Sequence, residues 1–375
     1  MPLISEKNDS IGSRRQLLAL IRDFGPISRA TLAVRADMTR PTVSAIVAEF
    51  MEAGLIREIG KGESTGGKRP ILLQLDDSRH FTIGIDLGEN FVIRGVRCDL
   101  TGRIRQSAVL EYQNRFESIR DVIADLIRQR AGHHTYNRIR GVGIAVSGTV
   151  NTETGEIRDS ETLDIVGKDL KNALEELTGF PICFENRASS AALAETMYGA
   201  GKHFRNLIYL TSGCGIGAGI VVDGKVFRGS HGAAGELGCQ SYHGTKRTLQ
   251  EELQVGALTE EAARRLRRPL TYHEFLQLLR ADDPTAKKLV VEAAGKLADA
   301  VRIAVALIDP EAVVLGGQLL ELGTPFFDHF RSILETEDQK IRFGRKLAVN
   351  PSALGEFGVA QGGATVILEQ IFQLY

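Results

Sequence analysis

The sequence predicts an α/β protein with a small, mainly helical N-terminal module and a larger body. Short amphipathic helix patterns fill the segment from about residue 10 to 76. After residue 80, strand patterns are repeatedly followed by helix patterns, which is typical of α/β lobes. A third observation is a glycine-rich stretch at residues 206–238. The length of 375 residues predicts two or three domains.

The bulk composition excludes several classes of protein. No apolar run approaches the ~20 residues of a membrane helix, and the first residues lack the layout of a signal peptide. The four cysteines have no CxC or CxxC spacing, so we expect a cytoplasmic protein without disulfides or membrane contact. Residues 10–75 hold ten Lys and Arg against six Asp and Glu, although the whole chain has a net charge of -1. A basic module on an acidic body is compatible with nucleic-acid binding.

The N-terminal module begins with three predicted helices. The first covers Arg14–Asp23 and ends before a Gly-Pro pair. Ser28 can cap the second helix and Thr39 the third. Pro41 lies in the first turn of the third helix, where proline needs no amide partner.

The third helix has two distinct faces. Apolar residues recur with helical spacing from Val43 to Phe50, so they bury one stripe. The opposite face is short, polar or basic and consists of Arg40, Thr42, Ser44 and Ala45. Such a face can enter the major groove of DNA and contact phosphates and base edges.

Two short strands, Leu55–Ile59 and Ile71–Leu75, follow and are joined by a polar loop. Gly67-Lys68-Arg69-Pro70 forms a slim basic finger of the kind that fits a narrow minor groove. Three helices and a two-stranded ribbon predict a winged helix-turn-helix domain that binds double-stranded DNA; its predicted contacts are Arg29, Arg40, Thr42, Ser44, Lys68 and Arg69. The alternative is a small helical protein-docking domain with a solvated loop.

In the body, three strand patterns end in polar residues. Phe81–Asp86 runs into Gly88-Glu89-Asn90, Ile139–Val146 runs into Ser147-Gly148, and Ile182–Phe184 runs into Glu185-Asn186-Arg187. Predicted helices follow at 118–130, 168–177 and 188–198.

The glycine-rich stretch begins with a buried strand at Leu207–Leu210. Glycine then occupies positions 213, 215, 217 and 219, which leaves one face of the backbone bare for a polyanion or a second strand. Asp223-Gly224 predicts a hairpin turn. Taken alone, this run of glycines also fits a hairpin in any α/β protein.

Helix patterns dominate the remainder of the chain. They cover 248–268 and 271–280, a long helix at Ala286–Ile308, and a final helix from about 358 to 375. A buried strand at Ala312–Leu315 leads into Gly316-Gly317.

Residues 206–238 and the N-terminal SRATLAVRADMTRPTVSAIVAEFMEAGLI and GGKRP segments resemble the ROK family (repressors, open reading frames and sugar kinases). The resemblance covers essentially the whole chain. It implies an actin/hexokinase-like body of two α/β lobes behind a winged helix-turn-helix domain at 10–76. The first lobe would cover 80–200 together with the C-terminal helix, and the second lobe would cover 201–357 with dimerisation helices.

The resemblance also implies phosphate loops, at Asp86, Gly88, Gly213, Gly215, Gly217, Gly316 and Gly317. Kinases of the family have Asp-x-Gly-Gly-Thr in the first loop, whereas this chain has Glu89 and Asn90. A carboxylate beside a triphosphate adds repulsion of roughly 1–4 kcal/mol at ~4 Å.

The kinases also end the Glu-Asn strand with an aspartate base, where this chain has Arg187, which stays protonated. We therefore expect vestigial phosphate loops, no ATP, no catalytic residue and no phosphoryl transfer. The alternative is that Glu185 or Asp164 replaces the base.

Family members hold zinc with a histidine after Glu-x-Gly and with downstream cysteines; here Cys239 replaces the histidine, and no cysteine follows before Gln250. Cys239 and His243 could supply two ligands, but a closed zinc site needs four, so we expect no zinc. The resemblance places a sugar effector at Gly148, Asn186, Glu236 and Gln250. Because Cys239 and Gln250 depart from the family pattern, the pocket would take a different sugar, a sugar derivative or nothing.

These observations predict a DNA-binding repressor of carbohydrate-related genes, controlled by a sugar in a non-catalytic body. The expected partners are double-stranded operator DNA, a sugar effector and further copies in a homodimer or tetramer. Two alternatives stay open: an active sugar kinase with a DNA-binding appendage, and a constitutive DNA-binding protein whose sensor has decayed.

Overall fold

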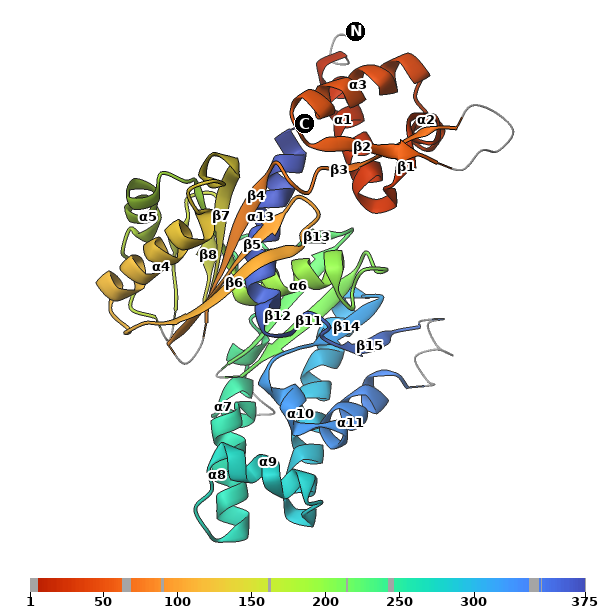
Figure 1. Ribbon diagram of the computed structural model, residues 1–375. Helices are drawn as coiled ribbons and strands as arrows, with labels where there is room; N and C mark the ends of the chain where they lie inside the picture. Colours follow the sequence, from red (N-terminus) through yellow and green to blue (C-terminus); the bar gives the residue numbers. More distant parts are fainter. Residues whose placement is uncertain are drawn as a thin grey trace.

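The computed structural model describes residues 6–62, 69–88, 91–160, 163–213, 215–241, 246–336, 344 and 346–374. The chain forms a head and two lobes, and each lobe is built on its own five-stranded sheet (Figure 1). In the described part of the chain, no helix combines the length and the apolar character needed to cross a bilayer.

The head holds the helices α1 (Glu6–Phe24), α2 (Arg29–Ala36) and α3 (Arg40–Glu52). Ser28 caps α2 by accepting a hydrogen bond from the Thr31 amide, and Thr39 caps α3 through the Thr42 amide. The sheet has the order β1-β3-β2, with β1 at Ile27–Ser28, β2 at Ile56–Lys61 and β3 at Ile71–Leu75. The sequence predicted two strands; the third is the two-residue β1, which pairs with β3 and is too short to show a pattern.

The sheet of the first lobe has the order β10-β7-β4-β5-β6. Its strands are β4 (Phe81–Leu87), β5 (Val92–Asp99), β6 (Ile104–Glu111), β7 (Ile139–Val146) and β10 (Ile182–Asn186). The helices α4 (Phe116–Ala131) and α5 (Leu170–Thr178) share a core with this sheet, and the short hairpin β8 (Val150–Asn151) and β9 (Glu156–Ile157) follows β7. Because β4, β7 and β10 are parallel, the residues that follow them meet at one edge.

The sheet of the second lobe has the order β13-β12-β11-β14-β15. Its strands are β11 (Leu207–Ser212), β12 (Ile216–Val222), β13 (Lys225–Val226), β14 (Ala312–Leu315) and β15 (Ala348–Pro351). A large core joins this sheet to α7 (Leu249–Leu253), α8 (Val255–Leu266), α9 (Tyr272–Arg280), α10 (Pro284–Ile308) and α11 (Thr324–Leu334).

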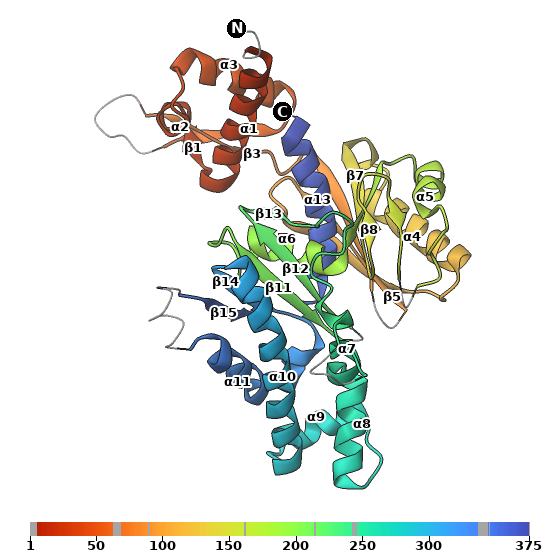
Figure 2. The same ribbon diagram turned by 180° about the vertical axis from the view of Figure 1, so that it is seen from behind.

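Two helices lie side by side between the sheets, α6 (Arg187–Tyr198) and α13 (Gly358–Leu374), as both views show (Figures 1 and 2). α6 packs on the second sheet and α13 on the first. Their backbones approach so closely that a Cβ on Gly362 would collide with the Ser190 carbonyl. The far end of α13 reaches the head, where Leu368 and Ile371 join the core of the head. A single helix therefore contacts both the interlobe region and the head.

Candidate functional site

A small cavity of about 120 Å³ lies between the lobes. The first lobe and the start of α6 contribute Ser147, Gly148, Asp159, Asn186, Arg187 and Ala188, and the second lobe contributes Thr211, Gly215, Ile216, Gly217, Glu236, Cys239 and Gln250. The four residues that the sequence predicted for a sugar site, Gly148, Asn186, Glu236 and Gln250, are thus brought together. Asp159 was not predicted, because it lies in a loop without any recognisable pattern.

Asn186 fixes two walls of this cavity. Its Oδ1 accepts hydrogen bonds from the amides of Ala188 (2.8 Å) and Ser189 (3.1 Å), so it is the N-cap of α6. Its Nδ2 donates to the Gly148 carbonyl (2.9 Å). Gly148 has a φ of 115°, and a Cβ there would collide with the Asp159 carbonyl. The local backbone therefore requires glycine at position 148, and the Asn186 side chain joins it to the start of α6.

Arg187 forms a bidentate ion pair with Asp86. Its Nε donates to Oδ1 of Asp86 (2.7 Å) and its Nη2 to Oδ2 (3.2 Å), and the Asp86 side chain is 2% exposed. The pair joins the end of β4 to the first turn of α6. The cation at the position of the expected base therefore also neutralises the aspartate of the first phosphate loop.

Gly88, at the start of the first phosphate loop, is held by two hydrogen bonds within the protein. The Gly88 amide donates to the Val92 carbonyl (3.2 Å), and the Tyr112 hydroxyl donates to the Gly88 carbonyl (3.2 Å). Burial raises the pKa of Tyr112 to about 12, so the hydroxyl keeps its proton. Glu89 and Asn90 lie outside the described residues.

The other glycine loops are similarly engaged. The Gly213 amide donates to the Gly215 carbonyl (3.0 Å), and the Ser212 hydroxyl donates to the Gly316 carbonyl (2.9 Å). Gly215 and Gly217 line the cavity, whereas Gly316 and Gly317 pack beside Tyr209 and Ser212.

Neither of the two carboxylates proposed as substitute bases lines the cavity. Glu185 is buried and accepts hydrogen bonds from Nε (2.8 Å) and Nη2 (2.5 Å) of Arg228, which precedes the loop that carries Glu236. Asp164 is exposed and pairs with Lys168 (2.7 Å), whose hydrogen bond lowers the pKa of this carboxyl. The sequence analysis did not single out Arg228, because its partner lies 43 residues earlier in the chain.

Cys239 is exposed, and its Sγ lies 4.0 Å from Oε2 of Glu236. Among the described residues, no group of three or more His, Cys, Asp and Glu is arranged to hold a metal ion. His243, which the sequence analysis considered beside Cys239 as a possible second ligand, lies outside the described residues.

In the head, Arg40, Thr42 and Ser44 lie on the exposed face of α3, opposite the buried stripe. Arg69 is exposed two residues before β3, and Lys68 lies outside the described residues. Arg29 is placed differently, because its Nη2 pairs with Glu58 on β2 (2.9 Å). Arg29 thus links α2 to the ribbon.

Polar contacts join the head to the body. His80 is buried, and its Nε2 donates to the Ala53 carbonyl at the end of α3 (2.8 Å), while its Nδ1 accepts from Nε of Arg140 on β7 (2.8 Å). Arg15 donates to the Gln373 carbonyl at the end of α13 (2.7 Å). The strand β7 therefore starts at the head contact and ends at the cavity.

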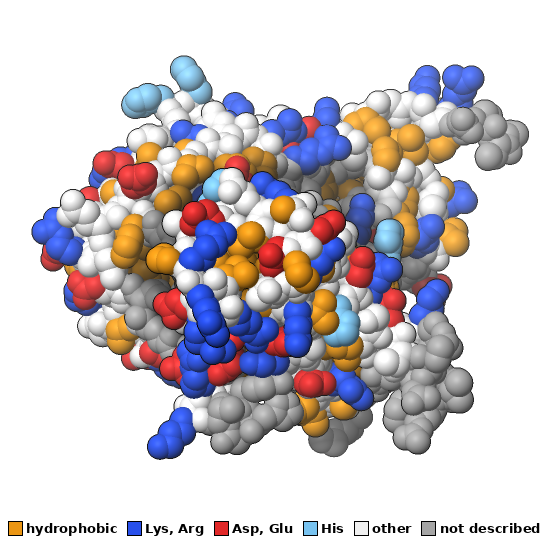
Figure 3. All heavy atoms as spheres, turned by 90° about the horizontal axis from the view of Figure 1, so that it is seen from below, with side chains coloured by type: hydrophobic (Ala, Val, Ile, Leu, Met, Phe, Trp, Pro, Cys, Tyr) orange, Lys and Arg blue, Asp and Glu red, His pale blue; other side chains and the backbone are white. Residues whose placement is uncertain are grey.

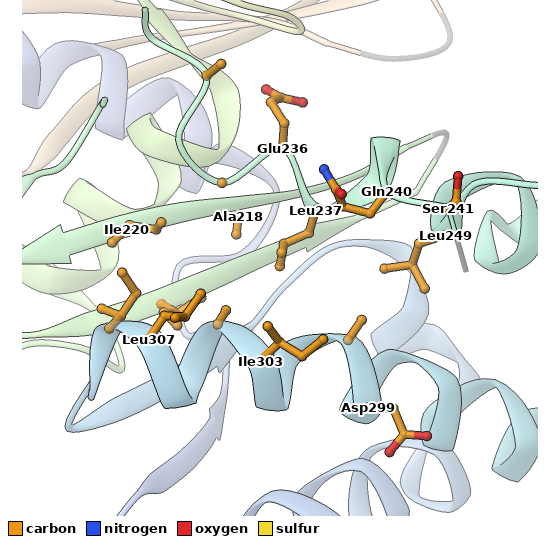
Figure 4. A pocket seen from close by; sticks show the side chains of 16 residues that line it. Ala218, Ile220, Glu236, Leu237, Gln240, Ser241, Leu249, Asp299, Ile303 and Leu307 are labelled. Carbon is orange, nitrogen blue, oxygen red and sulfur yellow. The ribbon is translucent and has the colours of Figure 1, made fainter. Parts of the chain in front are cut away.

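A second, apolar cavity of about 530 Å³ lies behind the Glu236 loop, between β12 and α10 (Figure 4). Glu236 points away from α10 in this view, whereas Leu237 points toward it. Ile303 and Leu307 of α10, which are 65% and 79% exposed, also line this cavity.

The end of the molecule opposite the head shows Lys and Arg side chains gathered among Asp and Glu (Figure 3). On α8, Arg265 pairs with Glu261 (2.7 Å) and with Glu292 of α10 (2.7 Å). At this end of the molecule, Arg264 also pairs with Glu261 (2.7 Å), so basic and acidic side chains alternate along α8.

The profile of the ROK family matches residues 82–370, which is more than half of the chain. The chain belongs to the ROK family. Among its relatives, the xylose repressor of Bacillus spizizenii is 27% identical over 389 residues, covering 96% of both chains. The DNA-binding transcriptional dual regulator NagC of Escherichia coli strain K12 is 24% identical over 368 residues, covering 91% of this chain and 90% of NagC.

Solved structures of the family confirm the predicted fold, a two-lobed ROK body behind an N-terminal domain. A ROK family transcriptional regulator, described as a homolog of Escherichia coli MLC, superposes with a TM-score of 0.83 at 20% identity and covers 98% of each chain. The ROK hexokinase of Thermus thermophilus superposes with a TM-score of 0.67 at 27% identity; it covers 78% of this chain and 99% of its own. Since the family match begins at residue 82, the whole head lies outside it.

Proposed function

We propose that this ROK protein is a DNA-binding repressor of carbohydrate-related genes, controlled by a sugar bound between the lobes of a non-catalytic body. The observation that carries the proposal is the Arg187–Asp86 pair in a body joined to a winged head. A cation that cannot accept a proton replaces the base, and it engages the aspartate of the phosphate loop. The relatives named xylose repressor and DNA-binding transcriptional dual regulator support the same conclusion.

The head supplies the DNA-binding surface of the proposal. The exposed face of α3 carries Arg40, Thr42 and Ser44, which can contact phosphates and base edges in a major groove. Arg69 at the foot of the wing would reach a neighbouring groove. Arg29 would act by positioning the ribbon, because Glu58 engages it.

The experiment combines three assays on the full chain. Duplexes that bind are first selected from a random library, and a gel-shift titration then measures their affinity with and without each sugar of a panel. A coupled assay measures ATP consumption with the same sugars. We expect sequence-specific binding that one sugar weakens, without ATP consumption above background. A chain that ignores duplex DNA at low salt yet consumes ATP with a hexose would contradict the proposal.

The alternative is an active sugar kinase with a DNA-binding appendage, which the likeness to the ROK hexokinase favours. The ATP assay separates the two, because only a kinase turns over ATP in proportion to sugar. A third outcome, DNA binding that no sugar alters, would favour a decayed sensor.

We further propose that two copies associate through the apolar cavity beside α10. Each chain has one head, and a twofold pair of heads matches a palindromic site. Ile303 and Leu307 project beside a cavity lined by Ile220 and Leu237, so one face offers both a protrusion and a hollow.

Sedimentation velocity tests this association. We expect Leu307→Glu to yield monomers, because a charge in an apolar interface loses its hydration. Leu177→Glu, on an exposed position of α5, is the matched control and should leave the size unchanged. A Leu307→Glu chain that keeps its size would exclude this face.

A further inference from the structure

We propose that Asp77, in the segment between head and body, is a positioning residue that fixes the head on the first lobe. It thereby sets the half-site spacing that a pair of heads accepts on DNA. Asp77 acts as part of a row of alternating charges, which consists of Arg57, Asp77, Arg105 and Asp99. The inference rests on the proposed function, because it concerns how the heads are presented to an operator.

The segment that joins the head to the body is short and held by hydrogen bonds. Residues 76–80 alone separate β3 from β4. The Asp76 amide donates to the Leu55 carbonyl (2.8 Å), and the Asp76 carboxylate accepts from the amide (2.9 Å) and the hydroxyl (2.6 Å) of Ser78. Asp76 and His80 are 5% and 7% exposed. The segment therefore differs from a flexible linker, whose backbone is solvated and free to rotate.

Asp77 connects a cation of the head to a cation of the body. Its Oδ1 lies 2.9 Å from Nη2 of Arg57 on β2, and its Oδ2 accepts a hydrogen bond from Nη2 of Arg105 on β6 (2.7 Å). Because Asp77 is partly exposed, an isolated pair with a mobile arginine would hold the head only weakly. The strength of the connection therefore depends on what fixes Arg105.

Arg105 is anchored by a buried carboxylate of the first lobe. Its Nε donates to Oδ2 of Asp99 (2.6 Å), whose side chain is 0% exposed. Oδ1 of Asp99 accepts from the amide (2.8 Å) and the hydroxyl (2.6 Å) of Thr101, in the turn between β5 and β6. Charge-assisted hydrogen bonds of this kind are short and directional. Arg105 is thus held so that its second nitrogen meets Asp77.

The turn between β5 and β6 also makes an apolar contact with the head. Leu100 is 1% exposed and belongs to the core of the head. Gly102 has a φ of 77°, and a Cβ there would collide with the ring of Tyr198 at the end of α6. The Gly102 carbonyl accepts from Nε2 of Gln361 on α13 (2.9 Å). Both helices between the sheets therefore support the turn on which the head rests.

A head fixed in this way restricts how a pair of heads can bind DNA. One inserted base pair moves a half-site by about 3.4 Å and turns it by about 35° around the DNA axis. Two rigidly held heads cannot follow this movement, whereas heads that pivot can. Removing the charge of Asp77 should therefore relax the spacing preference without weakening the contact of each head with its own half-site.

The first test compares the full wild-type chain with Asp77→Asn by gel shift. The duplexes are a selected palindrome, the same palindrome with one or two base pairs inserted at its centre, and a single half-site. We expect the insertions to weaken wild-type binding at least about 100-fold but Asp77→Asn binding only about tenfold, with half-site affinities within about twofold of each other. An Asp77→Asn chain that keeps the wild-type spacing preference, or that loses half-site affinity, would overturn the inference.

Two further variants show whether the charge row is the cause. Asp125→Asn removes an exposed carboxylate that pairs with Arg128, and this matched control should keep the wild-type spacing preference. Arg57→Met should relax the preference as Asp77→Asn does, and the double variant should relax it no further, because both changes break one connection. Additive effects of the two changes would show that Asp77 does not act through Arg57.

The second test does not depend on DNA. Hydrogen exchange on the full chain measures the opening of residues 76–80, and unchanged exchange in α10 shows that a variant is folded. We expect exchange in 76–80 to be about tenfold faster in Asp77→Asn than in the wild type or Asp125→Asn. If exchange is unchanged and the wild type binds DNA, the inference fails and the proposed function stands. If the wild type ignores duplex DNA, the proposed function fails and the role in spacing fails with it, whatever the exchange shows.

Discussion

Arg187 and Asp86 meet through positions 101 residues apart in the chain. The carboxylate is almost fully buried, so the guanidinium is its compensation for lost hydration. Arg187, which stands where the kinases of the family have an aspartate, therefore has a structural role. The cation that stands at the position of the expected base also compensates the buried aspartate of the first phosphate loop.

At the scale of this pair, we expect Arg187→Met to lower the free energy of unfolding by about 3–5 kcal/mol, because it leaves the Asp86 carboxylate buried without its partner. The double variant Asp86→Asn, Arg187→Met should recover part of this loss. Urea unfolding of the single and double variants measures both values.

A matched control is Arg128→Met, which breaks the exposed pair between Arg128 and Asp125. Exposed pairs contribute about 0–1 kcal/mol, so this change should be small. If Arg187→Met and Arg128→Met had the same free energy of unfolding, Arg187 would not be stabilising the buried Asp86 carboxylate.

At the scale of elements, α3 is held at both ends by polar contacts. Thr39 caps its start, and His80 donates to the Ala53 carbonyl at its end. Burial lowers the pKa of His80, and Arg140 and Arg79 lower it further, while the bond to the Ala53 carbonyl and the charge of Asp76 oppose this shift. The neutral ring fits both neighbours, because Nε2 donates and Nδ1 accepts from Arg140.

The stability that His80 contributes at the end of α3 should depend on pH. With a pKa below the ordinary 6.5, His80 is neutral in the folded chain, and the unfolded chain takes up the proton first as the pH falls. The contribution of His80 to stability is therefore complete above pH ~6.5 and is lost as the pH falls below it. We expect the wild-type unfolding midpoint to drop more between pH 7.5 and 5.5 than that of His80→Gln. His133→Gln, at an exposed position, should behave like the wild type.

Arg69, in the basic finger that the sequence predicts, gives a second prediction at the scale of elements. Replacing Arg69 by Ala should weaken binding to a selected duplex and reduce the slope of log affinity against log salt by about 0.9, the share of one phosphate contact. Arg268→Ala, at the end remote from the head, serves as the control. A gel-shift titration at several salt concentrations measures both slopes, and equal slopes would place Arg69 away from the phosphates.

At the scale of the whole molecule, α13 is the element that the parts share. It packs on the first sheet and on α6, and its end enters the core of the head through Ile367, Leu368 and Ile371. A movement of the lobes that follows sugar binding would therefore reach the head through a packed helix.

We expect Ile371→Ala to reduce the effect of the sugar on DNA affinity while the sugar affinity itself stays unchanged. The change removes apolar side-chain atoms from the contact between α13 and the core of the head. Ile119→Ala, in the core of the first lobe, should destabilise the chain by a similar 2–5 kcal/mol but keep the coupling. The measurement is DNA affinity with and without saturating sugar. If the sugar changed the DNA affinity of Ile371→Ala as much as that of the wild type, this contact would not transmit the effect of the sugar to the head.

Much of this architecture could be predicted locally. The caps at Ser28 and Thr39, the stripe of α3 and the alternating glycines of β12 are short-range patterns with direct physical causes. β1 and the hairpin of β8 and β9 could not be predicted, because strands of two residues exist only through their partners. The candidate sugar residues were identified through the family resemblance, since their positions span 148 to 250 along the chain.

By itself, the sequence determined that residue 187 cannot accept a proton, because an arginine side chain stays positively charged in any fold. It also determined where α2 and α3 begin, because the caps Ser28 and Thr39 act within a few residues. Only the tertiary structure decided that Arg187 reaches Asp86, that Arg228 reaches Glu185, and that the last helix enters the head. Such contacts depend on how two sheets pack around α6 and α13, and no local pattern encodes that packing.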